Sequence, residues 1–156
     1  MINKMNKNGS YVKLDNTLFY GIHPAIVKPD FEPDHYIILT EDHEFDYHKL
    51  DNMIFYPIKD RKSVIVNELD KIVNKILALN GTIYIACKGG HGRSGLIAAA
   101  VYSKKYKKDY NYTLKYINKE WSKQRDMTKI RPFIRKLGSP QTSIQKKVLK
   151  DYIGNQ

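Results

Sequence analysis

The residues best suited to chemistry in this chain lie in one short segment, residues 87–94, which reads CKGGHGRS and follows an apolar stretch at 83–86. Its glycines let backbone N–H groups approach an anion without a Cβ in the way, and a helix beginning there adds free N–H groups and a positive dipole end. The same positive setting favours the thiolate form of Cys87. The guanidinium of Arg93 can hold two phosphate oxygens at once. We call this segment the phosphate loop, and its chemistry predicts phosphoryl transfer onto sulfur.

The loop needs a strand before it and a helix after it. Residues 83–86 read as a buried strand, and residues 96–102 as a helix that begins near Ser94. Further strands are predicted at 11–21 (two, around a turn), 35–40 and 53–56, and an amphipathic helix after Ser63. Helices are predicted downstream at 113–121 and 127–137, and a last one capped by Ser139. Strands that alternate with helices and then give way to helices indicate an α/β layer fold.

The spacing of cysteine, five residues, arginine and serine resembles the signature loop of the cysteine-dependent protein tyrosine phosphatase superfamily, and the chain length resembles its compact dual-specificity members. The resemblance implies an α/β fold with a central mixed, largely parallel sheet flanked by helices on both sides. It implies Cys87 as nucleophile and phosphate binding by Lys88, Gly89, Gly90, His91, Gly92 and Arg93. One residue departs from the family pattern, because Ala86 stands where a histidine usually precedes the nucleophile.

A phosphocysteine mechanism needs an acid to protonate the leaving oxygen. In the family this acid is an aspartate on a loop upstream of the nucleophile, separated from it by one helix. The segment 56–60, YPIKD, resembles that loop and places Asp60 27 residues before Cys87. Asp46 and Asp51 are rivals without a comparable loop, and Asp60 could instead simply open the following helix.

Two further residues are implied as catalytic. Ser94 can donate a hydrogen bond to the sulfur and so help it leave when phosphocysteine is hydrolysed, although it could serve only as a helix cap. The segment 141–145, QTSIQ, resembles the loop that orients the hydrolytic water in tyrosine-specific members. Gln141 is the first candidate for that role and Gln145 the second. The alternative is a helix start with both glutamines facing solvent.

The substrate class stays open at this stage. Phosphorylated proteins, with phosphotyrosine best and phosphothreonine next, are the expected substrates. Lys88 and His91 in the loop resemble phosphoinositide phosphatases, although His91 could merely face solvent. The basic charge alone would suit an RNA 5′-phosphatase of the same fold. A non-catalytic phospho-residue binding module is supported only by Ala86.

Length and composition set the remaining expectations. The chain has 156 residues, with 27 Lys plus Arg against 16 Asp plus Glu and a net charge of +11, which favours weak binding of polyanions. We expect a flexible tail at 1–10 and a single phosphatase domain at 11–156, with no membrane span. One cysteine excludes an internal disulfide and indicates a reducing, cytoplasmic setting. The histidines lack metal-ligand spacing, so neither a metal nor a cofactor is expected.

Overall fold

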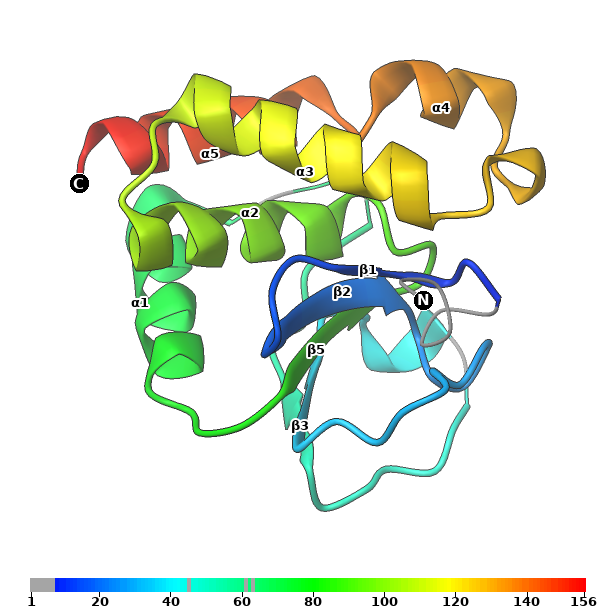
Figure 1. Cartoon of the computed structure of the whole chain (residues 1–156). Helices are drawn as coiled ribbons and strands as arrows, with labels where there is room; N and C mark the ends of the chain where they lie inside the picture. The colour runs from blue at the N-terminus through cyan, green and yellow to red at the C-terminus, as the bar shows by residue number, and fades with distance from the viewer. Residues whose placement is uncertain (1–7, 45, 61, 63) are drawn as a thin grey trace.

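The computed structural model describes residues 8–44, 46–60, 62 and 64–156, and five strands form one sheet in the order β1-β2-β5-β3-β4 (Figure 1). The strands are β1 (Tyr11–Lys13), β2 (Leu18–Ile22), β3 (His35–Ile38), β4 (Met53–Phe55) and β5 (Ile83–Cys87). The pair β1–β2 is antiparallel, and the other three pairs are parallel. The predicted mixed, largely parallel sheet is therefore confirmed.

The described α-helices come late in the chain, since one lies between β4 and β5 and the others follow β5. They are α1 (Val66–Leu77), α2 (Arg93–Tyr106), α3 (Tyr110–Gln124), α4 (Pro132–Leu137) and α5 (Ser143–Gly154), with short 3₁₀ turns η2 (Asp42–Glu44) and η3 (Met127–Lys129). The N-cap of α1 is Ile65, and the predicted cap, Ser63, lies outside the described residues. Among the described residues, no helix is long and apolar enough to cross a membrane.

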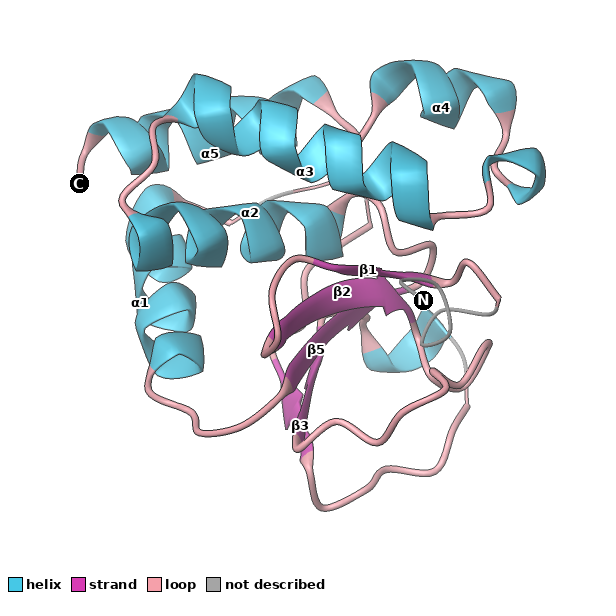
Figure 2. Cartoon of the chain, viewed as in Figure 1, coloured by secondary structure: helices cyan, strands magenta, loops and turns pink. Residues whose placement is uncertain are grey.

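The predicted flanking helices are confirmed, but in the described part of the chain the α-helices pack against one face of the sheet rather than both. One face packs against the helices, and Val12, Leu18, Ile37 and Ile85 join one apolar cluster with residues of α1, α2, α3 and α5. The other face carries a second apolar cluster, in which aromatic residues of the strands pack with Phe31 and Tyr47 from the loops. Loop segments, pink in Figure 2, run below the sheet. The contacts in this cluster include Phe31 against Phe19, with ring centroids 4.5 Å apart. Aromatic rings bury enough apolar area to close a sheet face without a helix.

The parallel strands β2, β5, β3 and β4 end at one edge of the sheet, so the segments that follow them begin side by side. The phosphate loop follows β5, Glu44 follows β3 and Asp60 follows β4. Backbone hydrogen bonds extend the alignment past the strands, since Leu39 N donates to Ala86 O and Ile58 N donates to Leu39 O, at 2.9 and 2.8 Å. The carboxyl edge of a parallel sheet is where α/β folds bind ligands.

Residues 9 and 10 belong to the folded part of the chain rather than to the tail predicted at 1–10. Ser10 is buried, and its carbonyl accepts from Ile22 N at 3.0 Å. The carbonyl of Gly9 accepts from the guanidinium of Arg125 at 2.9 Å. Residues 1–7 lie outside the described residues, so the tail prediction is untouched there.

Candidate active site

The phosphate loop turns sharply between β5 and α2 and carries Cys87 at its start. Gly90 has a φ of +74°, and a Cβ on it would lie 2.5 Å from the carbonyl carbon of Gly21, so both its conformation and its packing require glycine. Cys87 is buried, and its Sγ lies 3.2 Å from the hydroxyl of Ser94 in the first turn of α2. The structure thus brings the sulfur, the serine and a helix N-terminus together, as the sequence predicts.

Arg93 is buried against this loop with only 1% of its surface exposed. Its Nη1 donates to Glu44 Oε2 at 2.7 Å and to Ile58 O at 2.9 Å, and its Nη2 donates to Glu44 Oε1 at 2.9 Å. Its Nε is buried and has no hydrogen-bond partner among the described residues. A buried N–H without a partner costs free energy, which a hydrogen bond to an oxygen of a bound ligand would recover. This N–H can therefore bind such an oxygen.

Glu44 is a site residue that the sequence did not reveal. Burial alone would raise the pKa of Glu44, but hydrogen bonds from Arg93 and from the backbone N–H of Glu41 hold it below its usual value. The carboxylate is therefore ionised at neutral pH and fixes the orientation of the guanidinium. Glu44 lies in η2, the turn that follows β3. This position indicates a site residue only once β3 is known to lie beside β5.

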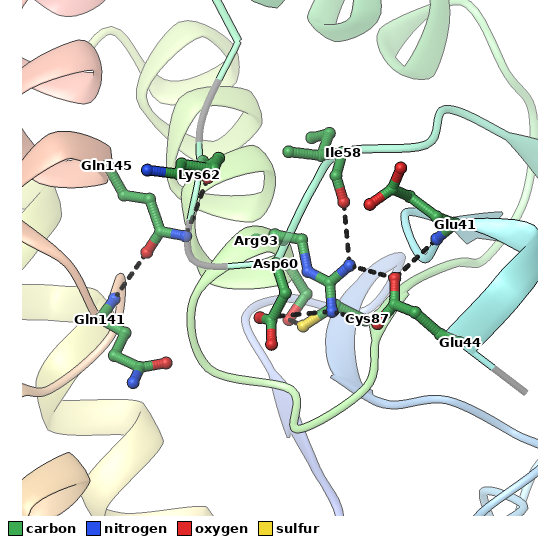
Figure 3. A network of polar contacts seen from close by, with 10 residues as sticks. Glu41, Glu44, Ile58, Asp60, Lys62, Cys87, Arg93, Gln141 and Gln145 are labelled. Carbon is green, nitrogen blue, oxygen red and sulfur yellow. Dashed lines mark hydrogen bonds and ion pairs between the residues drawn. The ribbon is translucent and has the colours of Figure 1, made fainter.

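Asp60 lies at the open side of the site, where Figure 3 shows Arg93 between Asp60 and Glu44 with Cys87 beside it. The Oδ1 of Asp60 is 3.5 Å from Arg93 Nη2, and 63% of the aspartate side chain is exposed. Within the described residues, neither Asp46 nor Asp51 forms an ion pair with Arg93. Of the three candidate acids, only Asp60 therefore lies beside the guanidinium that would hold the phosphate.

The residues at the middle of the phosphate loop divide into exposed and buried positions. Lys88 and Gly89 are exposed at the rim, whereas Gly90, His91 and Gly92 are buried. The prediction that the side chain of His91 either faces solvent or offers a second cation to the ligand is wrong. Its Nδ1 accepts from Trp121 Nε1 at 3.1 Å, so the ring packs inward against α3. Burial, and next the charge of Arg125, lower the pKa of His91 to about 3, so the ring is neutral.

A consequence of this buried neutral ring is acid sensitivity. Burial also lowers the pKa of His23 to about 4, against a nearby opposing effect of Glu44. Unfolding exposes both imidazole rings, which then bind protons below pH 6.5, whereas in the folded protein they stay neutral. Protonation therefore favours the unfolded state, so the stability is full above pH 6.5 and is lost as the pH falls below it. We expect the free energy of unfolding to drop by about 2 kcal/mol between pH 6 and pH 5, measured by urea titration. His91→Asn should remove about half of that drop, and a stability independent of pH over this interval would contradict the account.

Gln141 and Gln145 both lie against the phosphate loop. A Cβ on Gly92 would be 3.0 Å from the amide of Gln145 and 3.4 Å from Cβ of Gln141, and both glutamines are buried. Gln145 is committed to structure, because its Oε1 accepts from Gln141 N and Thr142 N, each at 3.1 Å. No described residue hydrogen-bonds to the side-chain amide of Gln141, so this amide is the one left for a water.

The predicted start of the last helix is corrected by the same contacts. Helix α5 begins at Ser143 with Thr142 as its N-cap, in a capping box with Gln145, rather than at Ser139. Ser139 is buried, and its hydroxyl donates to the carbonyl of His91 at 2.7 Å. The alternative in which both glutamines face solvent at a helix start is excluded by their burial.

Comparison with known proteins agrees with this geometry. No family model matches the sequence. Protein 197R of Invertebrate iridescent virus 6, a candidate tyrosine phosphatase by its name, is 47% identical over 55 residues, a match that covers 31% of this chain and 21% of that protein. The matched segment therefore spans about a fifth of that relative.

Solved structures match over nearly the whole chain. Tk-PTP in its active form has a TM-score of 0.73 and 22% identity, covering 94% of this chain and 98% of that chain. PTPMT1 in complex with PI(5)P has a TM-score of 0.64 and 19% identity, covering 93% and 95%. OH1 from the Orf virus, a tyrosine phosphatase with triple substrate specificity, has a TM-score of 0.59 and 14% identity, covering 92% and 87%. The chain has the fold of the cysteine-dependent tyrosine phosphatases, as the phosphate loop predicts.

Proposed function

We propose that this chain is a cysteine-dependent protein phosphatase that hydrolyses phosphotyrosine and, more slowly, phosphothreonine through a phosphocysteine intermediate. The observation that carries the proposal is the grouping around the phosphate loop: the Cys87 sulfur 3.2 Å from the Ser94 hydroxyl, and the buried Arg93 with an unpaired Nε and Asp60 at 3.5 Å. A nucleophile, an anion clamp and an acid within one site are what phosphoryl transfer requires.

The first step joins the sulfur of Cys87 to phosphorus while the bond from phosphorus to the leaving oxygen breaks. Asp60 gives its proton to that oxygen. The loop amides and the guanidinium of Arg93 hold the remaining phosphoryl oxygens, and Glu44 keeps the guanidinium in place from its other side. The product of this step is a phosphocysteine and a free alcohol or phenol.

The second step returns the enzyme to its starting state. Water attacks phosphorus and gives a proton to Asp60, and the sulfur–phosphorus bond breaks to release phosphate and the thiolate. The hydroxyl of Ser94, which lies 3.2 Å from the sulfur, turns its O–H toward the departing thiolate and donates a hydrogen bond to it. We assign the orientation of the water to Gln141, whose Cβ lies against Gly92 of the loop and whose side-chain amide has no described partner.

The alternatives fit the site less well. A phosphoinositide headgroup would gain from a second cation in the loop, but the ring of His91 is buried and its pKa is lowered to about 3. An RNA 5′-phosphatase has the net charge alone as support. A non-catalytic binding module would not need Asp60 beside Arg93. Phosphorylated proteins are therefore the proposed partners, and the cytoplasm the proposed compartment.

Substrate preference is tested by comparing kcat/KM for phosphotyrosine and phosphothreonine peptides, an inositol phosphate and a triphosphorylated RNA end. One fixed salt concentration is needed, since a protein of charge +11 binds polyanions without specificity. We expect phosphotyrosine to rank first and phosphothreonine to be hydrolysed measurably. A clear preference for the inositol phosphate or the RNA would overturn the protein-phosphatase assignment while leaving the site residues in their roles.

A further inference from the structure

A second arginine, Arg125, which follows α3, holds the phosphate loop from behind. Its Nη1 donates to the carbonyl of Gly90 at 3.0 Å, and its Nη2 donates to the carbonyl of Gly89 at 3.2 Å. The C=O and the following N–H of a trans peptide unit point in opposite directions, because the unit is planar. Drawing these two carbonyls outward therefore turns the N–H groups of Gly90 and His91 toward the anion site.

A third carbonyl of the loop is held from the same side by other residues. The carbonyl of His91 accepts from the hydroxyl of Ser139 at 2.7 Å, and that hydroxyl also lies 3.0 Å from the phenol of Tyr20. The backbone N–H of Ser139 donates to Asn118 at 2.9 Å, which fixes Ser139 in place. Three consecutive loop carbonyls are thus directed away from the pocket, and Arg125 supplies the ties to two of them.

Arg125 also places a positive charge in the interior, behind the phosphate loop. The side chain is 6% exposed, and within the described part of the chain it forms no ion pair with a carboxylate. Its Nε donates to the carbonyl of Gly9 at 2.9 Å, and its Nη1 also lies 3.4 Å from Nδ1 of His91. Burial lowers the pKa of Arg125, yet a guanidinium keeps its proton in proteins. Arg93, in contrast, is neutralised by Glu44.

Buried charges in proteins are normally paired. The groups that face Arg125 and the sulfur are Tyr20 and Tyr84 from the sheet and His91 from the loop, all of them neutral at pH 7 because burial raises the pKa of each phenol and lowers that of the imidazole. The anions that Arg125 can balance are then the thiolate of Cys87 and a phosphoryl group held by the loop.

We propose that Arg125 is a positioning residue for phosphate binding, which orients the loop amides through two carbonyls and supplies a fixed positive charge behind them. This inference rests on the phosphatase function proposed above and assigns a role in it to a residue outside the phosphate loop. It predicts that affinity for the phosphate group, rather than folding, is what Arg125 chiefly determines.

The experiment measures the binding of inorganic phosphate without turnover. Cys87 is the sole cysteine, so its alkylation by iodoacetamide reports on this site alone, and protection by added phosphate gives a dissociation constant. Arg125→Met should weaken phosphate binding by about 10- to 100-fold, the usual loss when a residue that orients binding groups is removed. Arg125→Lys retains the charge but lacks the planar fork, so it should recover only part of the affinity.

Gln124→Ala is the matched control. Gln124 joins the same end of α3 to β1, through hydrogen bonds with N and O of Lys13 at 2.6 and 2.8 Å. Among the described residues, these hydrogen bonds and one to Glu120 do not involve the phosphate loop. It should lower the melting temperature and leave the phosphate dissociation constant and KM unchanged. If Arg125→Met and Gln124→Ala lose affinity in proportion to lost stability, the role is structural and the proposal is overturned.

The remaining outcomes are also decisive. Phosphate affinity within twofold of the native value in Arg125→Met would overturn the proposal, and should that variant fail to fold, native affinity in Arg125→Lys would do the same. Absence of protection in the native protein overturns it as well. Protection by phosphate in a native protein that hydrolyses no phosphate ester would remove the proposed function but leave the role of Arg125 in anion binding.

Discussion

Cys87→Ser is expected to abolish phosphate release while the protein still binds phosphate. The serine hydroxyl would occupy the same place beside Ser94, 3.2 Å from the sulfur in the native protein, but it is a far weaker nucleophile than a thiolate. The loss in kcat should be roughly 10⁶-fold, the cost of removing a catalytic nucleophile. Initial rates with an aryl phosphate, alongside phosphate binding by calorimetry, make the measurement.

The melting temperature of Cys87→Ser serves as its control, since the replacement is nearly isosteric and the site is closed by the contacts of Arg93 and Glu44 rather than by the sulfur. Substantial turnover by the folded variant would remove Cys87 from its assigned role and require another nucleophile. No second cysteine exists to take its place.

Asp60→Asn is expected to have the second large effect on the catalytic rate. It should lower kcat by about 10²–10⁴-fold for alkyl and unactivated aryl phosphates, because the amide cannot protonate the leaving oxygen. The loss should be smaller for leaving groups that are stable as anions, and the fall of kcat/KM at high pH should disappear. Rates over a series of aryl phosphates with different leaving groups, each followed against pH, test this directly.

Asp46→Asn is the matched control for that series, because Asp46 is exposed on a neighbouring loop and forms no ion pair with Arg93 among the described residues. Its rates should equal those of the native protein. Equal losses in Asp60→Asn for all leaving groups would mean that Asp60 positions Arg93 rather than donating a proton. A loss in Asp46→Asn alone would transfer the acid role to that residue.

The sequence predicted the parts of the site that are close together in the chain. Cys87, Arg93 and Ser94 lie within one strand, turn and helix, whose local rules suffice to place them. Asp60 was proposed because its segment resembles the acid loop of the phosphatase family, and the structure places it beside Arg93. The α/β layer fold was predicted from the pattern of strands and helices, and the largely parallel sheet from the family resemblance.

The parts that were missed depend on packing between distant segments. Glu44 reaches Arg93 only because β3 is the neighbour of β5, and strand order is not written in any local pattern. Arg125 reaches the loop because α3 packs over β1, which lies far from it in sequence. His91 reads as a polar loop residue, yet the partner that turns it inward, Trp121, is 30 residues away.

The placement of the helices on one face of the sheet and the start of the last helix were not predicted, for a related reason. The second face is closed by aromatic residues of the strands together with Phe31 and Tyr47 from the loops, and loop residues carry no periodicity that would predict their part in it. Ser139 and Thr142 are both suitable N-caps by type. Thr142 is the N-cap, because it forms reciprocal hydrogen bonds with Gln145. The hydroxyl of Ser139 instead donates to the carbonyl of His91.

The central claim is that phosphate passes through the sulfur of Cys87, and the most direct test is to look for that bond. Turnover of an activated aryl phosphate by Asp60→Asn should be quenched in acid within the first catalytic cycles, and the peptide containing Cys87 examined by mass spectrometry. We predict one phosphoryl group on Cys87, together with a burst of phenol equal to the enzyme concentration. Steady turnover without a burst, and with an unmodified Cys87 peptide, would contradict the account.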